Sequence, residues 1–416
     1  MNDEAADGGF RALLGQPSFL RYQAVRLAAV VSIQVISVVV GWQAWERTED
    51  PAVLGWVGGV QFLPMLVFSF VSGEVADRFD RARVLQACHL GIAAVAAALL
   101  AWSRANIPSM YGAYAALFCF GALRAFAGPA GQALLPSLVP PRLYPRAVAV
   151  ASTTFQGAIL IGPALGGIVF GAFGAEAAYG LAALLQLAAF AVLFTVRGEH
   201  EPRSFSVDGT TLARLTGGLR FVWQRPVVLG AISLDLFAVL LGGAVALMPY
   251  YAREVLDVGE EGLGLLRSAP AAGAAVVAVY LGARPLGRHA GKVLLVCVGI
   301  FGAATMVFGA SESLWLSLGA LVVLGAADMV SIVVRQVAVQ GSTPPEMRGR
   351  VAAVSLLFIS ASNELGELES GLLASWLGPE RSVIVGGALA IAVTVIWAVI
   401  FPALRRFGEP EPARTP

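Results

Sequence analysis

Long apolar stretches alternate with short polar connections along most of the chain. About twelve of these stretches are roughly 18 to 25 residues long, and a helix of about 20 residues crosses the ~30 Å hydrocarbon core of a bilayer. The pattern predicts helices over residues 19–45, 54–75, 84–103, 110–135, 147–173, 175–196, 227–251, 262–284, 292–310, 314–339, 351–377 and 383–404. We therefore expect an all-α integral membrane protein with twelve transmembrane helices.

The longest polar connection, residues 197–225, divides the predicted helices into two sets of six. Within it, three leucines and a valine recur at helical spacing opposite two arginines, which predicts a short amphipathic helix on the inner membrane surface. We expect three parts: a six-helix bundle over residues 1–196, a cytoplasmic linker over 197–225 and a second six-helix bundle over 226–416.

The second half of the sequence repeats features of the first half. At an offset of 204 residues, Gly121 falls on Gly325. At an offset of 209 residues, Gly73 falls on Gly282. An internal duplication of this kind predicts two pseudo-symmetric bundles with a central cavity between them.

The composition agrees with a membrane protein. Of the 416 residues, 57% are hydrophobic and only 13% are charged, whereas soluble proteins average about 25% charged residues. The net charge of +1 says little, but about 20 of the 28 basic residues lie at the two ends and in the even-numbered connections. By the positive-inside rule, we expect both termini in the cytoplasm and a multi-pass protein of the cell (inner) membrane.

A charged connection follows the second predicted helix, and it includes Gly73, Asp77, Arg78, Arg81 and Arg83. Its form, Gly-x-x-x-Asp-Arg-x-x-Arg-x-Arg, resembles the cytoplasmic loop signature between the second and third helices of major facilitator superfamily transporters. The resemblance implies a gating loop. We expect Asp77 to latch the inner gate by pairing with Arg81 and by capping the predicted eleventh helix.

The predicted fifth helix carries Gly162, Pro163 and Gly166. This Gly-Pro-x-x-Gly segment resembles the antiporter motif that exporters of the superfamily carry in the same helix. The alternative interpretation is ordinary close packing of small residues against a neighbouring helix.

Other segments of the sequence resemble the same superfamily and one subgroup within it. Arg124-x-x-x-Gly128 resembles the superfamily's arginine motif linked to proton coupling, with Ala127 where that motif has glutamine. Leu234-Asp235-Leu-Phe and the glutamate-rich run that ends at Gly371 look like the subgroup containing the bacterial enterobactin exporter and related secretion effectors. Membership of that subgroup implies efflux.

Several charged residues interrupt the apolar helices, and a charge at the bilayer centre costs about 2.5 to 3.5 kcal/mol on insertion scales. Predicted helices 3, 6, 9 and 12 lack such charges, and the resemblance makes these helices peripheral. We expect six of the charged residues to line the substrate cavity: Arg26, Arg124, Asp235, Arg267, Asp328 and Arg335. The alternative is that the charges only pair with each other and hold the bundle together.

Glu364 and Glu367 share one face in the middle of the predicted eleventh helix. Antiport requires a group that takes up a proton in one state and releases it in another, and desolvation or a neighbouring carboxylate favours the neutral form of an acid. We expect proton coupling at Glu364, Glu367 or Asp235, with the glutamate pair first. If an arginine such as Arg267 or Arg335 neutralises the acid, it is instead a permanent strut.

The sequence indicates no other chemistry. Cys88, Cys119, Cys297 and the three histidines lack metal-ligand spacing, and no Gly-x-x-x-x-Gly-Lys-[Ser/Thr] segment is present. We expect no enzyme activity, cofactor, metal or nucleic-acid partner, and a monomer whose partners are a small-molecule substrate, protons and the lipid bilayer. Two alternatives remain open: a facilitator or importer of a small nutrient, and a receptor or scaffold that does not transport.

Overall fold

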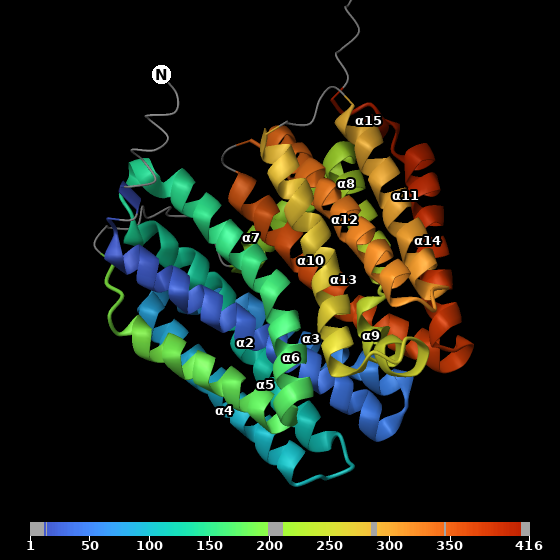
Figure 1. Cartoon of the computed structure of the whole chain (residues 1–416). Helices are drawn as coiled ribbons and strands as arrows, with labels where there is room; N and C mark the ends of the chain where they lie inside the picture. The colour runs from blue at the N-terminus through green and yellow to red at the C-terminus, as the bar shows by residue number, and fades with distance from the viewer. Residues whose placement is uncertain (1–11, 14, 199–210, 284–288, 345–346, 409–416) are drawn as a thin grey trace, which may run out of the picture. The chain divides into compact units, whose positions relative to one another are not determined.

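The computed structural model describes residues 12–13, 15–198, 211–283, 289–344 and 347–408, and every regular element in these ranges is helical (Figure 1). The longer helices are α2 (Pro17–Thr48), α3 (Pro51–Arg78), α4 (Arg81–Arg104), α5 (Tyr111–Leu134), α6 (Tyr144–Leu193), α7 (Thr211–Gln224), α8 (Pro226–Leu241), α10 (Gly259–Ala283), α11 (Ala290–Gly309), α12 (Leu314–Ser342), α13 (Arg348–Leu377) and α14 (Pro379–Ile400). The short turns are η1 (Leu135–Leu138), η2 (Pro141–Leu143), η3 (Val245–Leu247), α9 (Met248–Tyr250), η4 (Tyr251–Val255) and α15 (Pro402–Arg405).

Ten segments of the described chain are helical and are long and apolar enough to cross a membrane. One of them, Pro141–Leu193, contains two helices that meet at Gly174, where φ is 82° and ψ is 171°. Such a positive φ favours glycine, because it has no β-carbon. Helix α13 is 30 residues long and is not among the ten. The all-α membrane class is confirmed, and the total of twelve helices stays a prediction.

The seventh predicted helix, residues 227–251, is not continuous. Helix α8 ends at Leu241, and the chain resumes helical turns only at Val245. Two glycines cause the break, because glycine lowers helix propensity by about 1 kcal/mol relative to alanine. The break also packs closely: a β-carbon at Gly243 would lie 2.6 Å from the Ser370 hydroxyl on α13.

The described chain forms two compact units. Unit 1 comprises residues 1–48, 60–211 and 259–268, and unit 2 comprises residues 49–59, 212–258 and 269–416. The first turns of α3 therefore belong with unit 2, and the first turns of α10 belong with unit 1. The predicted division of the chain at the linker 197–225 stays a prediction.

Buried polar contacts join the helices inside unit 1. The Gln186 amide oxygen on α6 lies 2.8 Å from Nδ1 of His89 on α4, and the Gln186 amide donates to the Ala29 carbonyl on α2. Tyr179 on α6 donates to Gln43 on α2 at 3.0 Å. In a chain with few polar groups, such hydrogen bonds fix which helix faces meet.

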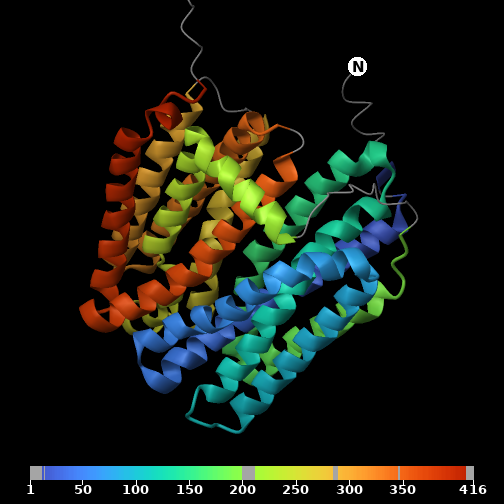
Figure 2. The same ribbon diagram turned by 180° about the vertical axis from the view of Figure 1, so that it is seen from behind.

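Unit 2 has an apolar core between α8, α11, α12 and α14, which includes Leu234, Leu294 and Val334. Helices α11 and α14 run side by side along one edge of the unit in both views (Figures 1 and 2). Their outward side chains stay apolar, since Val296 is 61% and Val399 is 74% exposed. Exposed apolar surface of this extent fits contact with lipid.

One pair of close contacts shows the internal repeat. Gly121 on α5 lies against the carbonyl of Gln61 on α3, and Gly325 on α12 lies against the carbonyl of Pro270 on α10. A β-carbon added at either glycine would collide with that carbonyl. The two glycines match at the offset of 204 residues, and the two carbonyls match at the offset of 209, so both units use the same small-residue contact.

Candidate functional site

A buried ion pair joins α8 to α12 within unit 2. Nη1 of Arg335 contacts Oδ2 of Asp235, and the two side chains are 5% and 7% exposed. Removing two charges from water costs several kcal/mol per ion, and their mutual attraction offsets that cost only when the geometry is good. The pair therefore marks a place where the fold tolerates charge inside a helix bundle.

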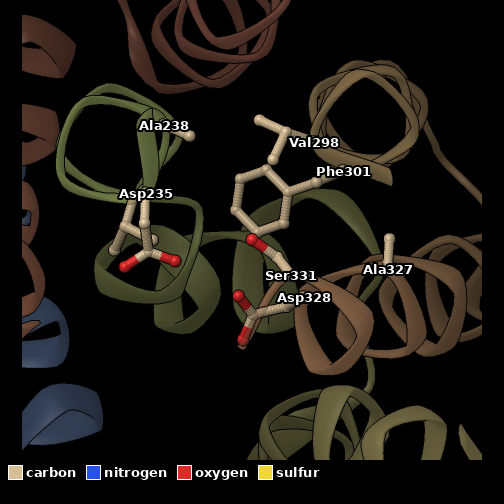
Figure 3. A pocket seen from close by; sticks show the side chains of 8 residues that line it. Asp235, Ala238, Val298, Phe301, Ala327, Asp328 and Ser331 are labelled. Carbon is tan, nitrogen blue, oxygen red and sulfur yellow. The ribbon is translucent and has the colours of Figure 1, made fainter. Parts of the chain in front are cut away.

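A small cavity lies beside this pair. Its lining includes Asp235 on α8, Phe301 on α11, and Asp328 and Ser331 on α12 (Figure 3). The cavity has a volume of about 10 Å³ open to the centre of a water molecule, and one buried water needs ~10–15 Å³ on this measure. The space is therefore close to that of a single water.

Ser331 gives the cavity an unusual polar wall. Its side chain is 3% exposed, and its hydroxyl has no hydrogen-bond partner in the described part of the chain. Figure 3 shows this hydroxyl beside the Asp328 carboxylate, with the Asp235 carboxylate on the other side of the space. Asp328, Ser331 and Arg335 share one face of α12, because they are three, four and seven residues apart. A buried hydroxyl of this kind usually bonds to water or to a ligand.

The glutamates of α13 lie elsewhere. Glu364 and Glu367 are partly buried, and neither is among the residues that line this cavity. Gly58 on α3 leaves room for Glu367, because a β-carbon at Gly58 would lie 2.8 Å from the Glu367 β-carbon. Helices α3 and α13 approach each other closely along this side of unit 2, where a β-carbon at Gly55 would lie 3.0 Å from the Gly371 α-carbon.

The remaining charged residues predicted for the substrate cavity lie in unit 1. Arg267 donates from Nη1 to the Ser37 hydroxyl at 2.5 Å, which links α10 to α2. The Arg124 guanidinium lies over the Phe120 ring at 5.5 Å. Arg26 is partly buried on α2. The structure thus brings Asp235, Asp328 and Arg335 together in unit 2, and that all six line one cavity stays a prediction.

The predicted gating loop is a tight connection between α3 and α4. Asp80 caps α4, since its Oδ1 accepts a 2.8 Å hydrogen bond from the Arg83 backbone N–H. Arg81 donates to the Ala133 carbonyl at 3.2 Å, and Arg78 pairs with Glu74 at 2.7 Å. The Asp77 side chain lies outside the described part of the structure, so its contacts stay a prediction.

The glycines of the fifth predicted helix bring α6 close to its neighbours. A β-carbon at Gly162 would lie 2.7 Å from the Gln34 β-carbon on α2, and one at Gly166 would lie 3.1 Å from the Val35 α-carbon. Gly167 allows the same close approach to α10, where a β-carbon at Gly167 would lie 2.9 Å from the Gly264 α-carbon. Close packing therefore accounts for these glycines, and a role in antiport stays a prediction.

Two features of the site escape sequence reasoning. Ser331 carries no signal of its own in an apolar helix, although its place one turn from Asp328 on the same face could have suggested it. The break at Gly242–Gly243 had a visible signal, since two adjacent glycines interrupt an apolar run.

These observations describe a helical, multi-pass membrane protein that holds charges of both signs inside its helices, and such charges are typical of substrate and ion pathways in membrane transporters. The family model of the Major Facilitator Superfamily matches residues 24–366, and the chain belongs to that family. Membership indicates a transporter rather than an enzyme.

Individual relatives of known name are also membrane transporters. The enterobactin exporter EntS of Citrobacter koseri is 26% identical over 404 residues, which covers 95% of this chain and 94% of the relative. The multidrug efflux pump Tap of Mycobacterium tuberculosis is 28% identical over 414 residues, with 94% of each chain covered. The resemblance expected from the loop signature and the α8 and α13 segments is thereby confirmed.

The fold also matches solved structures. A bacterial homologue of the human lysosomal transporter Spinster, solved in an inward-facing and unoccupied conformation, superposes with a TM-score of 0.70. The sequence identity is 14%, and the match covers 94% of this chain and 96% of the other. At this identity the likeness shows the fold alone, which is the predicted major facilitator fold.

Proposed function

We propose that the protein exports a small molecule across the cytoplasmic membrane by alternating access, driven by proton antiport. Two relatives that align over nearly the full chain are exporters by name, one for enterobactin and one for multiple drugs. Efflux is therefore a better hypothesis than import. The exported cargo is a small molecule that resembles a siderophore, a drug or a metabolite.

The buried cluster on α8 and α12 carries the proposal. Asp235 and Arg335 neutralise each other, which leaves Asp328 as a second acid that faces a water-sized cavity. Charged residues inside a membrane mark substrate and ion pathways, because an unused charge there is costly. A transporter that exchanges a proton for a substrate needs such an acid next to a space that water reaches in one state.

We assign further roles to the other charged residues. Arg26, Arg124 and Arg267 belong to the same substrate cavity. Glu364 and Glu367 are further candidates for the proton carrier, and Asp235, which pairs with Arg335, ranks after them. The α3–α4 connection is the gating loop of the cytoplasmic side, with both chain termini in the cytoplasm. A single chain suffices, because each chain contains both of the units that alternate.

The test uses the purified protein in liposomes with an imposed proton gradient. Enterobactin and a panel of drugs are loaded on the cytoplasmic side, and gradient-driven uptake is compared with uptake when a protonophore removes the gradient. We expect at least one compound to move only when the gradient is present, and to move in exchange for protons.

Variants and alternatives give the test its specificity. Asp328→Asn is expected to lose gradient-driven transport, whereas Glu312→Gln, an exposed acid outside the apolar helices, keeps it. Transport that is the same with and without the proton gradient favours a facilitator. Transport into the cytoplasm together with protons favours an importer. Absence of flux for the whole panel, with the protein folded, favours a receptor or scaffold.

A further inference from the structure

A second and much larger pocket opens at one end of unit 1. The α3–α4 connection, the end of α5 and the end of α6 form it, and its volume is about 690 Å³. These segments meet at the same end of the unit in Figure 2. Ligand pockets typically measure ~300–1,000 Å³, so this space suits a small organic group. The proposed substrate cavity and proton carriers do not include this pocket, although one of its walls is the α3–α4 connection that we propose as the gating loop.

Positive charge dominates the lining. Arg81, Arg83 and Arg197 line the pocket together with one acid, Asp80. Asp80 already accepts the Arg83 backbone N–H as the cap of α4, so its carboxylate is engaged in the fold. The Ala133 carbonyl accepts a hydrogen bond from Arg81, which fixes the direction of that guanidinium. Guanidinium groups bind phosphate through paired N–H donors, so the lining favours a phosphate-bearing anion.

An apolar surface adjoins this charge. Phe79 and Phe194 both line the pocket, and each is 63% exposed. They stand where two membrane-length segments begin and end, at Arg81 on α4 and Leu193 on α6. Exposed phenyl rings at the end of a membrane-length helix offer an apolar surface to the acyl carbons nearest the headgroups. A free phosphate ion gains nothing from these rings, whereas a phospholipid gains from both the rings and the arginines.

We propose that this pocket binds the phosphate headgroup of an anionic phospholipid, with Arg83 and Arg197 on the phosphate and Phe79 and Phe194 against the first acyl carbons. Basic pockets between membrane helices are suited to such headgroups, and each arginine near the surface contributes about a fivefold gain in affinity. The assignment is independent of whether the chain exports or imports.

Native mass spectrometry of the full chain with defined lipids tests the site. We expect the parent protein to retain phosphatidylglycerol in preference to phosphatidylcholine. The double variant Arg83→Ser/Arg197→Ser is expected to lose roughly thirtyfold of that preference. Arg142→Ser is the matched control, because Arg142 is an exposed arginine of unit 1 outside the pocket, and this variant keeps the preference.

Two further measurements test whether the guanidinium groups matter beyond their charge and whether the ligand is a lipid rather than a free anion. Arg83→Lys/Arg197→Lys keeps the charge and is expected to retain part of the preference. Millimolar inorganic phosphate is expected to leave the bound lipid in place. Equal retention of both lipids, an unchanged preference in the serine variant, or displacement of the lipid by inorganic phosphate each overturns the assignment, and the last outcome makes the pocket a free-anion site.

Discussion

Arg335 on α12 contacts the Asp235 carboxylate on α8, and both side chains are almost completely buried. The two residues are 100 positions apart in the sequence, so the contact is a product of the fold rather than of local helix geometry. It ties two helices of unit 2 beside the cavity that Asp328 faces. The buried ion pair carries no net charge, whereas either ion buried without its partner would cost several kcal/mol of stability.

The first prediction concerns this pair. Arg335→Gln leaves the Asp235 carboxylate buried alone, and Asp235→Asn leaves the guanidinium alone, so each single variant is expected to destabilise the fold by about 3–5 kcal/mol. The double variant Asp235→Asn/Arg335→Gln removes both charges and is expected to regain most of the lost stability. Thermal unfolding of the purified protein measures both effects.

Transport distinguishes a strut from a working site in the same variants. If the ion pair only holds α8 and α12 together, the stable double variant transports as the parent does. If the pair binds cargo or cycles with a proton, the double variant is stable and inactive. Additive losses of stability, with no recovery in the double variant, would contradict the pairing itself.

The second prediction identifies the coupling acid. Glu364→Gln, Glu367→Gln and Asp328→Asn are compared for gradient-driven export and for exchange of labelled cargo without a gradient. A neutral side chain at the coupling site is expected to abolish export and spare exchange, because only the proton step is lost. The pH profile of export flattens in the same variant. If all three variants keep the parent's export and pH profile, the proton travels through another group.

Sequence reasoning predicted the helices well, because about 20 apolar residues in a row have few other stable outcomes in a membrane. It failed at Gly242–Gly243, where two glycines inside an otherwise apolar stretch end the helix. The average hydrophobicity of a stretch hardly changes when two of its residues are glycines, although two glycines disfavour a helical backbone. The close packing of Gly243 against Ser370 on α13 comes from tertiary structure and was not visible in the pattern.

The site was predictable only in part for a related reason. The spacing of Asp328 and Arg335 placed both on one face of a helix, since seven residues make about two turns. Spacing cannot choose the partner on another helix, and the sequence offered Arg267 and Arg335 equally as arginines that could neutralise an acid. The fold decides: Arg335 meets Asp235, and Arg267 donates to Ser37.

The third prediction tests the repeated glycine contact. Gly325→Ala places a methyl group against the Pro270 carbonyl on α10, and the atoms it meets belong to the backbone, which cannot move aside as a flexible side chain can. We expect a loss of about 1–3 kcal/mol, as for other overpacked sites. Gly319→Ala on the same helix is the control, because nothing lies within 4 Å of the added carbon, and alanine favours a helix. An equal loss of stability in both variants would refute the contact.

The last prediction compares two acids of the gating loop, Asp77 and Asp80. Asp80 caps α4 through its 2.8 Å bond from the Arg83 N–H, and asparagine caps a helix as well as aspartate does, so Asp80→Asn is expected to keep both stability and transport. Asp77 differs in its proposed role, because its pairing with Arg81 depends on a negative charge that asparagine lacks. Asp77→Asn is therefore expected to keep stability, to reduce transport strongly, and to raise the reactivity of a cysteine placed in the cytoplasmic half of the substrate cavity. Unchanged transport and reactivity in Asp77→Asn would show that the loop does not latch through this carboxylate, and a loss of transport in Asp80→Asn alone would assign the latch to Asp80.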